Sequence, residues 1–316
     1  MSREKSLEIL KLESLLNRIP VHHPLREKIA NHLGRLSAGL YGESTADHYM
    51  KYLPGKSLQD IRLHDGVRPF QIDALLLSQK CLVILEVKNY KGELQFDFDH
   101  RKLTRTIEGK SEVFQDPFVQ VELQTFQLQR WIQKAAFPSI PIHFFTVIAN
   151  PNASLTFQGE DLNKRKRVLL VKQLPTHLTA FIGGFKGENV WSDDQLNKFS
   201  ARIKAEYIPY DSDVMKQYGI FRDELVLGVP CPSCNLLGMI RRRDHWLCGG
   251  CGTKSKDAHL QLLRDHQLLV GDTITNAEFR VSAGIGSVKV ARRLLKKSCT
   301  PSGDNTNAKK YTIDLI

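Results

Sequence analysis

Four cysteines in the last third of the chain have the spacing of a metal site. Cys231 and Cys234 form one C-x-x-C pair, and Cys248 and Cys251 form a second pair after thirteen intervening residues. Each pair places two thiolates close enough to share one tetrahedral ion, and so short a segment needs that ion to fold. The sequence therefore predicts a structural Zn²⁺ in a ribbon over 228–255, without an open position for a catalytic water. The alternatives are four unrelated cysteines or a redox pair.

A second group of chemically active residues interrupts two strongly apolar segments. Asp73 lies in QIDALLLS, and Glu86 and Lys88 lie in CLVILEVK. Because side chains alternate along a strand, Glu86 and Lys88 share one face, with Asp73 on the preceding strand of the same hairpin. Two carboxylates can hold Mg²⁺ or Mn²⁺ through oxygen ligands, and a lysine beside them can orient an attacking water. This is the apparatus of metal-dependent phosphodiester hydrolysis.

The alternative for the Glu-x-Lys pair is a solvated ion pair on a structural sheet, which is a common arrangement. Here the charged groups lie within runs of Ile, Val and Leu, where a charge is costly unless it is paired or metal-bound. We therefore expect a functional site at this hairpin.

The surrounding segments predict an α/β core with a mixed sheet. Helical spacing after Gly42 predicts a helix that starts at Glu43. The other elements follow from apolar periodicity, turn residues and helix caps. They are a helix over 5–18 that ends before Pro20, three adjacent strands within 68–96, a helix over 117–134, strands at 141–149 and 166–174, and a helix capped by Ser192.

Four segments together resemble the nuclease-related domain (NERD) family. They are GLYGE at 39–43, QIDALLLS at 71–78, LEVKNYKGEL at 85–94 and DPFVQ at 116–120. The resemblance covers about residues 35–150. It implies the restriction-endonuclease-like core of the PD-(D/E)XK nucleases, with a Mg²⁺-dependent site and DNA as the substrate.

Carried over by position, the resemblance implies Glu43 as the helical acid, Asp73 and Glu86 as metal-binding carboxylates, and Lys88 as the catalytic lysine. From the residues alone, we expect a charged Lys88 that positions the water. We expect Glu43 to accept a hydrogen bond from a metal-bound water or to steady Lys88.

Gln120 matches a helical glutamine of the family. The family has Asn-Pro before this residue, whereas this chain has Asp116-Pro117. We expect Gln120 to hold either a phosphate or Lys88.

Three short helices are predicted after the ribbon, at 257–269, 275–285 and 287–297, the last capped by Ser287. This is a helix-turn-helix spacing, and the polar loop between Lys297 and Tyr311 predicts a wing. The segment is similar to the tail that follows the ribbon in some NERD proteins. A helical cap with a solvated face is the alternative to DNA binding by the basic face of the third helix, which consists of Lys289, Arg292, Arg293 and Lys296.

The charge of the whole chain favours a polyanionic partner such as DNA. Residues 228–316 carry 14 Lys and Arg against 7 Asp and Glu, which gives +7 of the total +11. A merely soluble basic surface is the alternative. No window approaches the roughly 18 apolar residues of a membrane span, no complete nucleotide-binding fingerprint is present, and the cysteine pattern favours a reducing compartment, so we expect a cytoplasmic protein.

Two functions of different classes remain open. One is a Mg²⁺-dependent DNA nuclease, and the other is a DNA-binding or adaptor protein that uses a nuclease-like fold without cutting. The form of the nucleic acid, DNA or RNA, and the oligomeric state stay open. The predicted organisation is an N-terminal helical segment (1–34), a NERD domain (35–155), its completion and a connector (156–227), the zinc ribbon (228–255) and a winged-helix-like domain (256–316).

Overall fold

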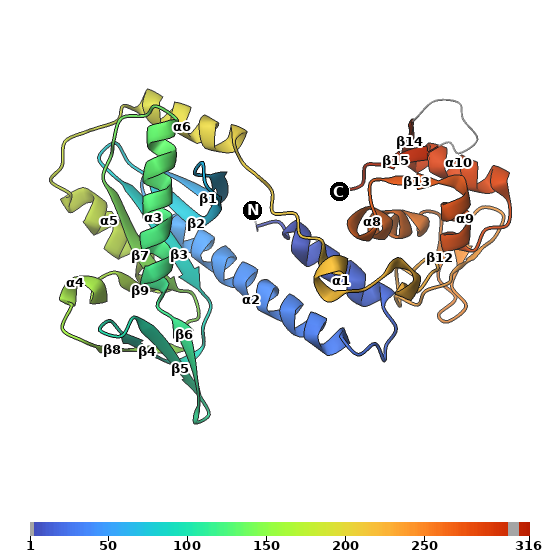
Figure 1. Cartoon of the computed structure of the whole chain (residues 1–316), viewed down its shortest axis with the longest axis horizontal. Coiled ribbons are helices and arrows are strands. Elements are labelled where there is room, and N and C mark those ends of the chain that lie inside the picture. The colour runs from blue at the N-terminus through green and yellow to red at the C-terminus, as the bar shows by residue number, and fades with distance from the viewer. Residues whose placement is uncertain (1–2, 303–309) are drawn as a thin grey trace. The chain divides into compact units, whose positions relative to one another are not determined.

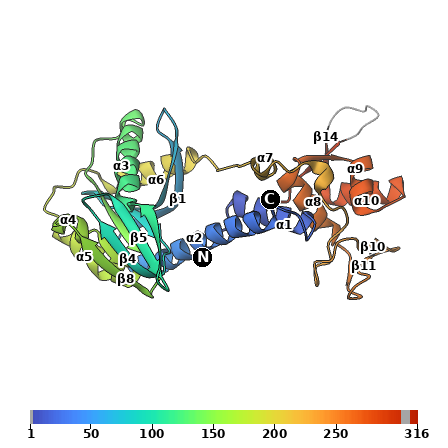
Figure 2. The ribbon, with the colours of Figure 1, turned by 60° about the horizontal axis from the view of Figure 1, so that its bottom comes forward.

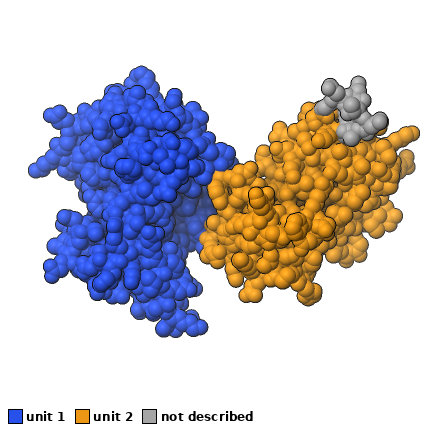
Figure 3. All heavy atoms as spheres, in the orientation of Figure 1, with its two compact units in different colours: residues 1–4, 37–209 blue, residues 5–36, 210–316 orange. Residues whose placement is uncertain are grey.

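The computed structural model describes residues 3–302 and 310–316, and the chain divides into two compact units. Unit 1 consists of residues 1–4 and 37–209, and unit 2 consists of residues 5–36 and 210–316 (Figure 3). Each unit is therefore assembled from two separate parts of the chain. No helix in the described part combines the length and the apolar character that a membrane span needs.

A five-stranded mixed sheet forms the centre of unit 1 (Figure 1). In spatial order its strands are β1 (Lys56–His64), β2 (Pro69–Leu77), β3 (Leu82–Lys88), β7 (Ile142–Ile148) and β9 (Val168–Leu170). The first three strands are antiparallel neighbours, and β7 runs parallel to both β3 and β9. The apolar runs of the sequence predict four of these strands, but not β1, whose exposed face is polar.

Helices cover both faces of this sheet and give unit 1 three layers (Figure 2). On one face, Ala46 of α2 (Arg26–Met50) and Leu178 of α5 (Leu174–Gly184) share a buried cluster with the odd-numbered residues of β3. On the other face, α3 (Pro117–Lys134) and α6 (Asp193–Ala205) pack through Trp131 and Phe199, whose ring centroids are 5.6 Å apart. The mixed α/β core of the sequence analysis is confirmed.

A second sheet follows β3 and corrects the prediction of three adjacent strands. Its order is β6 (Lys110–Gln115), β5 (Lys102–Ile107), β4 (Gly92–Asp97) and β8 (Ala153–Gln158), and it is followed by the short helix α4 (Leu162–Arg165). The third predicted strand, β4, thus leaves the central sheet. The chain turns at Gly92, where φ is 91° and a Cβ would lie 2.5 Å from the main-chain oxygen of Thr106, so only glycine fits this turn.

The helix that carries Glu43 begins at Arg26, so the predicted helix start at Glu43 is wrong. Gly42 interrupts the apolar pattern without ending the helix. A Cβ at this position would lie 2.6 Å from the Cβ of Asn89, so the glycine allows α2 to pass close to the end of β3. The side chain of Asn89 also donates a hydrogen bond to the main-chain oxygen of Ala38, at 2.7 Å. This close approach brings Glu43 to the end of the central sheet.

Unit 2 combines helices with two small three-stranded sheets. It starts with α1 (Leu7–Arg18), the helix predicted over 5–18, and the sheets have the antiparallel orders β10-β11-β12 and β13-β15-β14. The predicted loop between Lys297 and Tyr311 includes residues 303–309, which lie outside the described residues. The remaining elements are α7 (Val214–Tyr218), β10 (Ile240–Arg241), β11 (Trp246–Leu247), β12 (Lys254–Ser255), α8 (His259–Leu269), β13 (Thr273–Thr275), α9 (Asn276–Ala283), α10 (Val288–Ser298), β14 (Cys299–Ser302) and β15 (Lys310–Ile313).

A buried ion pair fixes α1 to α8. Arg18 Nε donates to Asp265 Oδ2 at 2.7 Å, and Ser14 Oγ donates to Asp265 Oδ1 at 2.8 Å. The two charged side chains are only 4% and 5% exposed. The Arg18 guanidinium also donates to the main-chain oxygen of Gly228, at 2.7 Å, so it connects α1 to the start of the ribbon as well.

We expect Arg18→Met to lower the free energy of unfolding by about 3–5 kcal/mol, because it leaves the buried Asp265 without its counterion. Equilibrium urea unfolding followed by circular dichroism measures this loss. The matched control is Arg222→Met, which removes an exposed pair with Glu278 and should cost less than about 1 kcal/mol. Equal losses in the two variants would show that the Arg18 pair does not hold α1.

Candidate functional site

Glu86 and Lys88 lie on the face of β3 that α3 covers. Glu86 is 1% exposed, and both of its carboxylate oxygens accept a hydrogen bond. Lys88 Nζ donates to Oε1 at 2.6 Å, and Gln124 Nε2 donates to Oε2 at 2.8 Å. Lys88 Nζ also donates to Gln120 Oε1, at 3.0 Å. The alternation of β3 and the helical turn of α3 thus join these four side chains in one network.

The charge state of Lys88 follows from this network. Burial opposes the charged form, but the attraction of Glu86 and its hydrogen bond, together with Asp73, raise the pKa of Lys88. The side chain is therefore an ammonium group at neutral pH. An ammonium group can orient a water or a phosphate oxygen but cannot accept a proton, which favours the positioning role over that of a general base.

Asp73 lies where β2 ends its regular pairing with β3, since the ladder stops at the pair Ala74–Leu85. Its Oδ2 accepts a hydrogen bond from the backbone N–H of Val87, at 2.8 Å. Burial, followed by repulsion from Glu86 and Glu43, raises the pKa of Asp73 well above its usual range. The carboxylates thus repel one another, and a cation between them would relieve this repulsion.

The guanidinium group of Arg3 is a positive charge next to these acids. The sequence did not predict this residue as part of the site. Its NH1 lies 2.5 Å from Glu43 Oε2, its Nε lies 2.7 Å from Asp47 Oδ2, and its NH2 donates to the main-chain oxygen of Asp73 at 2.6 Å. The Arg3 side chain is 8% exposed. Burial raises the pKa of Glu43, although the charge of Arg3 opposes this shift.

The structure brings all five predicted site residues to the end of β3, but it does not join them equally. Glu86, Lys88 and Gln120 are in direct contact, and Asp73 reaches them through the backbone of β3. Glu43 is held by Arg3, and no described contact joins it to Lys88. The additional residues are Asp47 and Gln124, which a helical spacing of four from Glu43 and Gln120 could have indicated, and Arg3, which no local pattern indicates.

The residues at this site fit a divalent cation by their chemistry. Mg²⁺ and Mn²⁺ prefer oxygen ligands, and Asp73, Glu86 and Glu43 are carboxylates that repel one another. The oxygens of these carboxylates are, however, further apart than the sulfur atoms of the four cysteines. Within residues 3–302 and 310–316, only those cysteines bring three or more potential metal ligands of His, Cys, Asp or Glu within 4.8 Å of one another.

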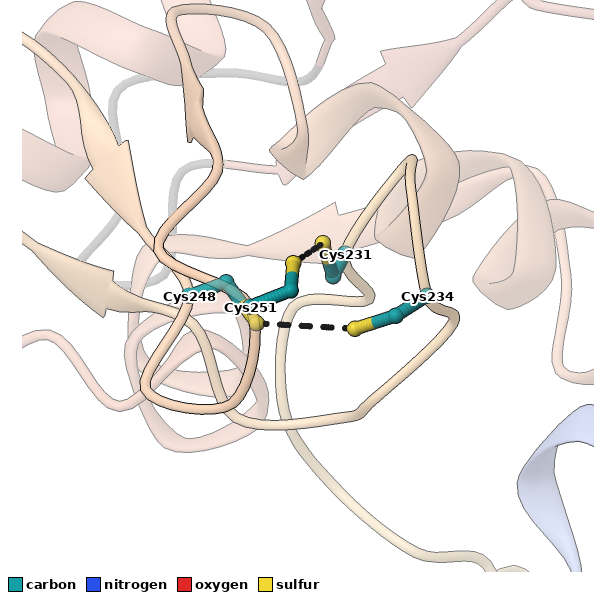
Figure 4. A group of neighbouring side chains, drawn as sticks. All are labelled: Cys231, Cys234, Cys248 and Cys251. Carbon is teal, nitrogen blue, oxygen red and sulfur yellow. Dashed lines mark hydrogen bonds between the residues drawn. The ribbon is translucent and has the colours of Figure 1, made fainter.

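The four cysteines form the second candidate site, in unit 2. Figure 4 shows their side chains converging from two loops. The Sγ atoms of Cys231 and Cys251 are 3.6 Å apart, as are those of Cys234 and Cys248. A tetrahedral zinc site with Zn–S bonds of about 2.3 Å has an S–S separation of about 3.8 Å. The arrangement is compatible with a structural metal site.

The predicted basic face of α10 is accessible. Lys289, Arg292, Arg293 and Lys296 are all exposed, whereas the apolar side of the same helix is buried in the core of unit 2. Ser287 caps the helix by accepting a hydrogen bond from the backbone N–H of Val290, as the sequence predicts.

Comparisons with known proteins identify the region around the first site. The model of the family described as nuclease-related domain (NERD) matches residues 38–149. This match confirms the family resemblance and contains Glu43, Asp73, Glu86, Lys88 and Gln120. No curated protein and no solved structure matches the chain.

We expect Arg3→Ala to lower the free energy of unfolding of the metal-free protein by about 1–3 kcal/mol, because Glu43 and Asp47 lose their charged partner. A divalent cation should partly replace the guanidinium, so added Mn²⁺ should raise the Tm of this variant more than that of the wild type. Differential scanning calorimetry of the zinc-loaded proteins measures both effects. Arg3→Lys keeps the charge, so its stability and its Tm rise with Mn²⁺ should lie between those of the wild type and Arg3→Ala. If Mn²⁺ raised the Tm of Arg3→Ala no more than that of the wild type, the cation would not replace the guanidinium.

We expect Cys234→Ala to abolish stoichiometric zinc binding and to unfold the ribbon, because a structural zinc supplies on the order of 10 kcal/mol of binding free energy. Trp246 is fully buried, so its fluorescence should shift to the red. Metal analysis and fluorescence emission spectra measure the two effects. Cys299→Ala, which lies outside the cluster, should keep the zinc; a Cys234→Ala protein with full zinc content would refute the site.

Proposed function

We propose that residues 38–149, with their match to the nuclease-related domain family, form the catalytic part of a DNA nuclease that depends on Mg²⁺ or Mn²⁺. The observation that carries this proposal is the position of Lys88. Its ammonium group donates hydrogen bonds both to the buried carboxylate of Glu86 and to Gln120 on α3. The other carboxylate of the site, that of Asp73, lies nearby on β2. A purely structural sheet would gain more from an apolar side chain at position 86.

Each residue of the site has a role that its contacts support. Asp73 and Glu86 would hold the divalent ion, which would supply positive charge to a phosphate and lower the pKa of a water. Lys88 orients the attacking water and keeps its proton. Gln120 accepts a hydrogen bond from Lys88 and so fixes the direction of the ammonium group. Glu43 would accept a hydrogen bond from a bound water once Arg3 is displaced.

The fold of unit 1 supports this assignment. The β2–β3 hairpin presents the acids, the parallel neighbour β7 continues the mixed sheet, and helices cover both faces. This arrangement is the one expected for the restriction-endonuclease-like core over 35–155. We propose that 156–227 completes this core and connects it to the ribbon.

Unit 2 provides the DNA-binding part in this proposal. The order α8, β13, α9, α10, β14, β15, with β15 between β13 and β14, supports a winged helix. Its α10 would enter the major groove with Lys289, Arg292, Arg293 and Lys296. The four cysteines would hold Zn²⁺ for stability alone, and the need for free thiolates favours a reducing compartment such as the cytoplasm.

A specific observation favours the second candidate function, a DNA-binding adaptor without nuclease activity. Arg3 already neutralises Glu43 and Asp47, and its NH2 binds the backbone of Asp73. The acids of unit 1 also do not come together as a ligand cluster among the described residues. In an adaptor, this contact would be permanent and the site would bind no divalent ion.

We expect Lys88→Ala to lower the rate of metal-dependent DNA cleavage by on the order of 10²–10³-fold while DNA affinity changes little, because the ammonium group acts on the reacting water. Asp73→Asn should abolish cleavage. Gel analysis of linear, nicked, branched and single-stranded DNA with zinc-loaded protein and Mg²⁺ or Mn²⁺ measures these rates.

The matched control is Lys102→Ala, which removes an exposed lysine of β5 and should leave cleavage unchanged. Folded wild-type protein that binds DNA but cleaves no substrate at any Mg²⁺ or Mn²⁺ concentration would refute the nuclease and leave the adaptor.

A further inference from the structure

The zinc ribbon carries a basic motif that the metal site does not use. Arg241, Arg242 and Arg243 follow one another at the turn between β10 and β11. The backbone N–H of Arg242 donates to the main-chain oxygen of His245, at 2.8 Å, which closes the turn. The side chains of Arg242 and Arg243 are exposed and have no ion-pair partner in the described part of the chain. The turn therefore presents two free guanidinium groups to solvent.

The ribbon that carries this turn contacts α10. Lys297 Nζ, at the end of α10, lies 3.6 Å from Asp257 Oδ1, two residues after β12. Burial and, after it, repulsion from the charge of Arg293 on α10 lower the pKa of Arg241. The ribbon and α10 also share one hydrophobic cluster, which includes Trp246 and Leu295. The arginine turn and the basic helix are thus fixed relative to each other.

Arg241 has guanidinium nitrogens that no side chain of this region pairs with. Its guanidinium lies 5.4 Å from the ring centroid of Trp246, and its Nε and NH1 atoms are buried without a hydrogen-bond partner among the described residues. The acid of the same turn, Asp244, lies 2.8 Å from His245 Nδ1 instead. Buried guanidinium nitrogens without partners are costly, and a phosphate bound at the neighbouring Arg242 and Arg243 would offset part of the positive charge at Arg241.

We propose that the Arg241–Arg243 turn and the exposed face of α10 form one continuous surface for the phosphate backbone of duplex DNA. In this arrangement Arg242 and Arg243 bind phosphates beside the groove that α10 enters. Guanidinium groups match phosphate oxygens in paired hydrogen bonds, and these contacts carry no base specificity. The inference rests on the proposed function only for the identity of the polyanion as DNA.

The double variant Arg242→Ala/Arg243→Ala tests this surface, because both side chains are exposed and outside the zinc site. Binding of the full chain to a fluorescent 20-base-pair duplex is followed by anisotropy at several NaCl concentrations, without divalent cation. We expect the Kd at about 0.15 M NaCl to rise about tenfold and the slope of log K against log salt to become shallower by about two, one for each lost phosphate contact.

Two controls make the result specific. Lys198→Ala/Lys204→Ala removes the same charge from exposed positions of α6 and should change neither Kd nor slope beyond about twofold. Unchanged zinc content and Tm show that the ribbon variant is folded.

The outcome is independent of catalysis, since the assay needs no cleavage. Loss of affinity with a reduced salt slope supports the surface even if the protein cleaves no DNA. Wild-type affinity in the ribbon variant, or an equal loss in the α6 control, would overturn it; the arginine turn would then be free for an acidic protein partner.

Discussion

A carboxylate buried among apolar side chains must be compensated, and unit 1 is arranged around this requirement at Glu86. Lys88 supplies the opposite charge from the same face of β3, and Gln124 supplies the second donor from α3. These contacts specify how α3 lies over the sheet, in addition to the packing of Trp131 against Phe199. The two hydrogen bonds of Lys88, to Glu86 and to Gln120, give its ammonium group a fixed direction. The stability of the sheet and the geometry of the site therefore depend on one buried charge.

The main constraint in unit 2 is that a short ribbon cannot form a hydrophobic core by itself. Its Trp246 and Cys248 are buried in the same cluster as Phe279 of α9 and Leu295 of α10. A metal held by the cysteines would add to the stabilisation that this packing against the helices provides. The packing of Trp246 in this core connects the ribbon, whose strands have only two residues, to the helices of unit 2.

The local features of the sequence predicted the parts of the structure that depend on local geometry. Strand alternation placed Glu86 and Lys88 on one face, and the caps at Ser192 and Ser287 form as expected. The departure of β4 depends on Gly92 and its contact with a strand that follows later, which no local pattern reveals. The course of α2 likewise depends on a close approach to Asn89. Arg3 lies 70 positions from its partner Asp73, so its contribution to the site appears only in three dimensions.

Unit 2 is formed by two distant parts of the chain, so its first part is synthesised long before its second. Arg18 and its partner Asp265 are 247 positions apart, and all of unit 1 between residues 37 and 209 is made before α8 exists. At about 5–20 residues per second, Arg18 is synthesised roughly 12–50 s before Asp265. Leu12 and Leu15 likewise precede their cluster partners Val214 and Met215. Unit 1 can close around its own core within that time. The first part of unit 2 thus stays without its second part throughout the synthesis of residues 37–209 of unit 1.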